Sequence, residues 1–145
     1  MDSVEKFAPA LGRILLGLLF VVAGYGKIWA IDATATQMAS HGIPLPNLLV
    51  YGAVALELGG GLMLMAGLLT RFIALVFAFY VLILAMAFHN YWAAPAAAQH
   101  AQQVDFLHHL AIIGGMIYVF VYGAGSVSLD ALLGLAGPRP SAAIA

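Results

Sequence analysis

Four long apolar stretches constrain this chain more than any other feature. They cover residues 8–29, 47–69, 72–92 and 106–122. Each is close to the roughly 20 residues that a helix needs to cross the hydrocarbon core of a membrane. Inside lipid, only helices and closed barrels satisfy their own backbone hydrogen bonds. The sequence therefore predicts an all-α integral membrane protein, an antiparallel four-helix bundle embedded in a lipid bilayer.

The composition supports this class and excludes others. Of the 145 residues, 64% are hydrophobic and 8% are charged, whereas about a quarter of a soluble domain is charged. A water-soluble fold would need a larger core than this length can enclose. The formal net charge of -1, without a basic block, excludes a nucleic-acid partner. Cysteine is absent, so disulfides, thiolate metal sites and a thiol redox relay within this chain are excluded.

The ends of the chain and its charges predict a domain plan and a topology. We expect a polar lead at 1–7, a membrane domain at 8–130 and a flexible tail at 131–145. A cleaved signal peptide is the alternative for the first apolar run, but that run is too long and no cleavage motif follows it. Four spans place both termini on one side.

Basic residues are more numerous on the side of the termini. That side carries Lys6, Arg71 and Arg139, whereas the other carries Lys27 at a helix end. The positive-inside rule then predicts cytoplasmic termini in a bacterial inner membrane.

Two longer connections lie between the spans, both on the outer side. In the first, a short helix around 34–40 should end in the run 41–46, because glycine and two prolines stop a helix. The second is predicted as a loop of small residues at 93–104. Asp105 then becomes the N-cap of the fourth span, and His108 and His109 fall in its first turn.

One face of the first span carries most of its unusual residues. Arg13, Gly17, Phe20, Gly24 and Lys27 recur at helical spacing, and the two glycines allow a neighbouring helix to approach closely. Arg13 is interpreted as a topology anchor, as a site residue or as a phospholipid contact.

The second span contains Glu57 near its middle, followed by three glycines. A carboxylate at that depth must be paired, protonated or directed into a cavity. We expect either a functional role or a buried pair with Lys27, which alternatively extends to the lipid head groups.

Alternating helix directions place ionisable groups of all four spans in the outer half of the membrane. A quinone head-group site fits these groups, because histidine and glutamate exchange protons and aromatic rings line a flat slot. A divalent metal at His89, Asp105, His108 and His109, or a haem between two histidines, is the alternative cofactor. Adjacent helical residues point about 100° apart, so His108 and His109 together do not bind one small ion. The candidate site residues are Glu57, His89, His108 and His109 as proton-exchanging groups, with Lys27, Phe88, Tyr91 and Asp105 holding the head group.

Eight segments in their order and spacing resemble the DoxX family of small four-helix membrane proteins. They include the Glu-Leu-Gly-Gly-Gly run at 57–61. The others lie at 12–20, 23–27, 41–44, 70–71, 88–92, 106–115 and 123–130.

The resemblance implies a membrane oxidoreductase component, since the family takes its name from a subunit of an archaeal thiosulfate:quinone oxidoreductase. Many relatives carry Lys-Asn where this chain has His108-His109, so groups that titrate near neutral pH replace a permanent cation. We therefore expect a quinone-interacting subunit, with a partner oxidoreductase subunit or a homodimer as its assembly. The alternative is a non-enzymatic membrane protein that binds metal, haem or lipid, or that scaffolds partner enzymes. A small transporter would require a dimer, because four spans lack a broken-helix pair.

Overall fold

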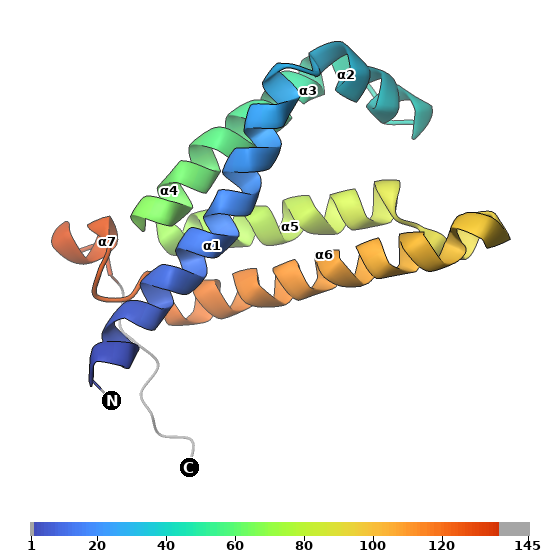
Figure 1. Ribbon diagram of the computed structural model, residues 1–145. Helices are drawn as coiled ribbons and strands as arrows, with labels where there is room; N and C mark the ends of the chain where they lie inside the picture. The colour runs from blue at the N-terminus through green and yellow to red at the C-terminus, as the bar shows by residue number, and fades with distance from the viewer. Residues whose placement is uncertain (1, 137–145) are drawn as a thin grey trace. The chain divides into compact units, whose positions relative to one another are not determined.

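The computed structural model describes residues 2–136, and these form two compact units (Figure 1). Unit 1 comprises 2–69 and 124–136, and unit 2 comprises 70–123. All regular elements of the described residues are helical. Four helices are long and apolar enough to cross a membrane, namely Ser3–Ile28, Pro46–Ala66, Thr70–Ala93 and Ala96–Tyr122. The predicted all-α membrane class is confirmed.

Unit 1 pairs the first span with the second. Its elements are α1 (Asp2–Ile28), α2 (Ile31–Ser40), α3 (Pro46–Ala55), the π-helical segment η1 (Leu56–Gly60), α4 (Gly61–Ala66) and α7 (Leu129–Leu132). Along α1, Arg13 contacts the carbonyl of Leu64, and Lys27 contacts Glu57. Because the numbers rise on one helix as they fall on the other, the two spans run antiparallel.

The first connection confirms the predicted short helix. Helix α2 ends at Ser40, and Gly42 has a positive φ of 73°, which glycine adopts without steric cost. Pro46 then begins α3, a position that proline tolerates because the first turn leaves its backbone N–H groups unpaired.

The predicted face of α1 is the face that packs inside unit 1. Arg13, Gly17, Phe20 and Gly24 are buried, and Lys27 is half-buried. The glycines bring two backbones into contact: a Cβ added to Gly17 would lie 2.7 Å from the carbonyl oxygen of Gly61. Any larger residue at Gly17 would therefore separate α1 from α4.

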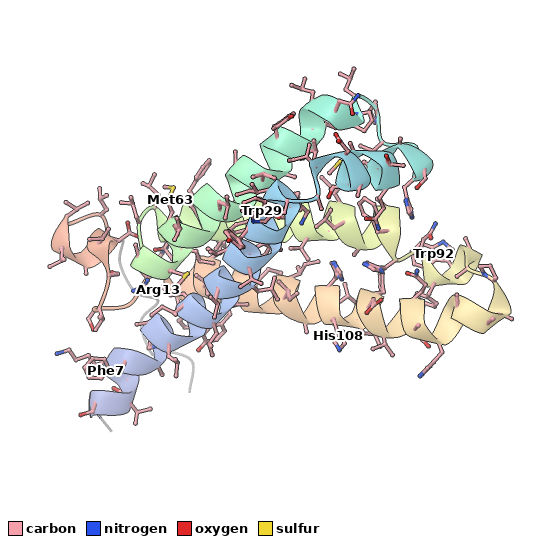
Figure 2. All side chains as sticks on the ribbon, turned by 45° about the horizontal axis from the view of Figure 1, so that its top comes forward. Phe7, Arg13, Trp29, Met63, Trp92 and His108 are labelled. Carbon is pink, nitrogen blue, oxygen red and sulfur yellow. The ribbon has the colours of Figure 1, made fainter. Side chains whose placement is uncertain are left out.

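Arg13 is a structural cross-link within unit 1. Its Nε donates to the carbonyl of Ala124 at 3.1 Å, and its Nη1 donates to that of Leu64 at 3.1 Å. The guanidinium also donates to the carbonyls of Met65 and Val127. Arg13, labelled in Figure 2, is buried, so its interpretation as a phospholipid contact is wrong: its donors are used by backbone carbonyls inside the protein.

Asp130 also fixes the segment that contains Ala124 and Val127, by bonding to the backbone after α4. Its Oδ1 accepts from the backbone N–H of Leu69 at 2.7 Å, and its own N–H donates to Gly67 at 2.8 Å. Ser128 caps the short helix α7 by accepting from Ala131 at 3.1 Å. Residues 124–132 are thus fixed against α1 and the end of α4. The rest of the predicted flexible tail, from 137 onward, lies outside the described residues.

Unit 2 pairs the third span with the fourth. It contains α5 (Thr70–Phe88), the 3-10 turn η2 (Tyr91–Ala93) and α6 (Ala96–Tyr122). Helix α6 begins at Ala96, so the loop predicted at 93–104 and the N-cap role predicted for Asp105 are wrong. Pro95 precedes the helix, and the alanines and glutamines that follow favour helical structure. Asp105, His108 and His109 therefore lie in the interior of α6.

Replacing Gly17 with alanine is expected to destabilise unit 1 by about 1–3 kcal/mol, because the methyl group would overlap Met65 and the Gly61 carbonyl. Gly12→Ala on the same helix is the matched control, since nothing lies within 4 Å of a Cβ at that position. Unfolding by SDS in mixed micelles, followed by far-UV circular dichroism, measures the difference. Equal unfolding curves for the two variants would contradict the close approach of α1 and α4.

Arg13→Lys is expected to lower the free energy of unfolding by about 3 kcal/mol or more. A lysine ammonium cannot replace the guanidinium fork at carbonyls on two chain segments, and buried carbonyls then lose their donors. Limited proteolysis should cut within 124–136 sooner in this variant than in Lys6→Ala, a control at an exposed cation. The same cleavage rate in both variants would contradict the cross-link.

Candidate functional site

Unit 1 contains a bidentate ion pair in the middle of its second span. The Lys27 Nζ donates to both carboxylate oxygens of Glu57, at 2.9 Å and 2.8 Å. The Glu57 side chain is 2% exposed and the Lys27 side chain 26% exposed. The predicted pairing of these two residues is therefore present.

The backbone around Glu57 is adapted to this pair. Glu57 lies in η1, and π-helical segments occur often at functional sites. On the facing helix, a Cβ added to Gly24 would come within 2.9 Å of the Glu57 Cβ. Glycine at position 24 thus lets the carboxylate approach α1 closely enough to reach the lysine one turn further on.

Unit 2 contains a second polar cluster, between the end of α5 and the middle of α6. The His89 Nδ1 lies 2.9 Å from the Gln102 Oε1 and 3.8 Å from the Asp105 Oδ2. The rings of His89 and His109 pack against each other, with centroids 4.7 Å apart and planes tilted by 42°. The His109 Nδ1 lies 2.8 Å from the backbone carbonyl oxygen of Asp105.

Helical spacing explains why these groups meet. Asp105 and Phe106 lie three and four residues after Gln102, and His109 lies four and three residues after them, so all of them share one face of α6. Further along that stripe, Met116 is fully buried. The polar cluster thus continues, toward the start of α6, the face that α6 packs against α5.

Three aromatic rings adjoin the cluster through Phe106. The Phe106 ring lies 5.6 Å from the rings of both Tyr91 and Trp92, edge-on in each case. Tyr91 and Trp92 form the turn η2 after α5 and lie 5.2 Å apart. Imidazoles and flat aromatic surfaces therefore occur together at one end of unit 2.

His108 does not belong to this cluster. Its side chain is exposed and leaves α6 on the side away from α5, whereas His109 contacts His89 (Figure 2). Among residues 2–136, no group of three or more His, Asp or Glu side chains is placed to hold a metal ion. The structure thus does not support the alternative metal site at His89, Asp105, His108 and His109.

The pair formed by His89 and His109 also has no room for a haem between its two rings. Axial ligation places the two imidazoles on opposite faces of the macrocycle, with the iron between them. The rings of His89 and His109 instead touch each other directly. Their contact leaves no space for a macrocycle between them.

The predicted site residues thus form two sets, each within one unit. Unit 1 brings together Lys27 and Glu57, and unit 2 brings together His89, Asp105 and His109, with Tyr91 among the adjoining aromatics. Phe88 is half-buried at the end of α5.

Sequence reasoning missed Gln102, Trp92 and Phe106 as members of the unit 2 cluster. The signal was the spacing of 102, 105, 106 and 109. This spacing places the four residues on one helix face only if α6 begins before residue 102, as it does in the structure.

Lys27→Met is expected to destabilise unit 1 by about 3–5 kcal/mol, because it leaves a buried carboxylate without its cation. Glu57→Gln should cost less, since the partly exposed lysine can extend toward water. The double variant should be more stable than Lys27→Met alone. A double-mutant cycle from SDS unfolding checks this order, and additive effects of the two changes would show that the pair is not coupled.

Comparison with known proteins places these residues in a family context. The DoxX family model matches residues 8–90, which include Lys27, Glu57 and His89 but not Asp105 or His109. The chain is 34% identical over 133 residues to the inner membrane protein YqjF of Escherichia coli (strain K12), covering 92% of this chain and 97% of YqjF.

Two further relatives are similar over shorter stretches. The inner membrane protein YphA of the same organism is 32% identical over 120 residues, or 83% of this chain and 86% of YphA. CatD of Bacillus subtilis (strain 168), whose full name is putative oxidoreductase CatD, is 33% identical over 78 residues. The match covers 54% of this chain and 57% of CatD. No solved structure shows a significant match. The family model spans more than half of the chain and the two inner membrane relatives span most of it, so this protein belongs to the DoxX family.

Proposed function

We propose that this DoxX family membrane protein is a component of a membrane oxidoreductase and binds a quinone head group at the unit 2 cluster. The observation that carries the proposal is the contact between the His89 and His109 imidazoles beside three aromatic rings. A quinone takes up or releases protons as it changes redox state. Imidazole is the side chain suited to exchange them near neutral pH.

The chemistry of the cluster matches the two parts of a quinone. The head group is flat and carries two oxygens, which imidazole nitrogens can contact. The prenyl tail is apolar, and the outward faces of α5 and α6 carry exposed apolar side chains such as Leu82, Ile83 and Leu110. His89 is 23% exposed, so a ligand entering from the membrane can reach its ring.

The position of the cluster along the spans also fits. Tyr91 and Trp92 lie at the end of the third candidate span, and such aromatics are typical of the membrane–water interface. A proton passed to His89 or His109 would have a short route to water, because Asp105 is half exposed at 52%.

Electrons require a second component. The chain has no cysteine for a thiol redox relay, so a partner oxidoreductase subunit would carry the electrons. The similarity to CatD supports oxidoreductase chemistry in this family. The similarity to YqjF and YphA supports placement in the bacterial inner membrane, and the excess of Lys6, Arg71 and Arg139 supports cytoplasmic termini.

Protein purified in mild detergent is expected to contain quinone after organic extraction and chromatography. His89→Ala and His109→Ala should each lower the head group recovered per protein, quinol and quinone counted together, about tenfold, since each removes a hydrogen-bonding ring from the cluster. His100→Ala is the matched control on the same helix, because His100 is exposed and outside the cluster.

Two other outcomes would contradict the proposal. Quinone that is retained in both cluster variants would place its site elsewhere in the protein. Parent protein without quinone, which also takes up none when reconstituted with it, would favour the scaffolding role.

A further inference from the structure

The hydrogen bonds of His109 determine which of its ring nitrogens carries the proton. Its Nδ1 lies 2.8 Å from the backbone carbonyl oxygen of Asp105. A carbonyl oxygen accepts hydrogen bonds and never donates them, so Nδ1 must carry the hydrogen. In the neutral ring, Nε2 is then an unprotonated acceptor.

His89 is held in the same way. Its Nδ1 lies 2.9 Å from the Gln102 Oε1, and the Asp105 carboxylate is on the same side, with Oδ2 at 3.8 Å. With the Gln102 oxygen facing the ring at hydrogen-bond distance, Nδ1 carries the hydrogen here too, because an amide oxygen accepts. The neutral His89 ring therefore also presents Nε2 as an acceptor.

Two adjacent imidazoles thus offer lone pairs rather than N–H groups to a ligand. The ring centroids are 4.7 Å apart, so the two rings that carry these acceptors are direct neighbours in unit 2. The carboxylate of Asp105 adds further acceptor capacity to the cluster. A ligand that bonds to these groups must itself bring hydrogen-bond donors, because an unprotonated imidazole nitrogen and a carboxylate oxygen only accept.

We infer that this site selects the reduced, dihydroxy form of the head group, a quinol, over the oxidised quinone. The inference rests on the proposed function and specifies the form that is bound. A quinol has two O–H donors that can each donate to an imidazole Nε2. A quinone has two carbonyl oxygens, which accept only and would face acceptors on the protein.

The backbone of α6 and the side chain of Gln102 determine which nitrogen of each ring is protonated, and so produce the preference for the quinol. The Asp105 carbonyl lies one helical turn before His109, so helix α6 itself fixes the protonated nitrogen of that ring. Gln102 fixes the other from the same face of α6. Changing Gln102 should therefore alter the choice between quinol and quinone, although the His89 ring itself is retained.

Anaerobic binding of decylubiquinol and decylubiquinone to the detergent-solubilised full chain tests the inference. The chain has two tryptophans, Trp29 and Trp92. In a Trp29→Phe background, quenching of Trp92 fluorescence reports binding, since Trp92 lies 5.6 Å from Phe106 beside the cluster. We expect the quinol to bind about tenfold more tightly than the quinone.

Variants separate the acceptor role from simple loss of packing. His109→Ala should weaken quinol binding about tenfold and leave the weaker quinone binding little changed. His109→Gln keeps an amide oxygen that can accept in place of Nε2, so it should recover part of the quinol affinity. His100→Ala should bind both forms like the parent. Nitrogen-15 NMR of labelled histidine should show the Nδ1–H tautomer for His109, independently of any ligand.

The outcomes are distinguishable. Equal or tighter binding of the quinone would overturn the inference while the proposed function remained. Binding of neither form would overturn both. An Nε2–H tautomer at His109 would overturn the inference irrespective of affinity, since the ring would then present a donor.

Discussion

The absence of hydrogen-bonding solvent in the hydrocarbon core is the constraint on which the rest of this structure depends. Every polar group at that depth must find its partner within the chain. Arg13 meets this condition with backbone carbonyls, and Glu57 meets it with Lys27. Each of these pairings fixes the positions of the residues that take part in it, and so determines where polar groups lie in unit 1.

The Lys27–Glu57 pair and the unit 2 cluster differ in how their polar groups are hydrogen-bonded. In the Lys27–Glu57 pair, opposite charges bond to each other through both carboxylate oxygens. In the unit 2 cluster, each imidazole has one nitrogen occupied and one remaining for a ligand. The first arrangement favours a fixed structure, and the second is the one to which the proposed function assigns proton exchange with a bound head group.

The sequence predicted much of this architecture, because hydrophobic length and helical periodicity act locally. The four spans, the short helix before the second span and the buried face of α1 all follow from such patterns. The pairing of Glu57 with Lys27 followed from the cost of a carboxylate in lipid. The start of α6 did not, because glutamine and histidine are polar enough to suggest a loop although their neighbours favour a helix. The Gln102 contact was lost with that error. The role of Arg13 depends on carbonyls more than one hundred positions away, and no local pattern carries that information.

The partners of Arg13 also impose an order on assembly. Its contacts with Ala124 and Val127 span 111 and 114 positions of the chain. At about 5–20 residues per second, a ribosome needs roughly 10 s to make the intervening residues. During that time the first span is complete while its guanidinium lacks half of its acceptors. Unit 1 therefore gains these two contacts only after residues 124–127 have emerged from the ribosome, well after its two spans have been made.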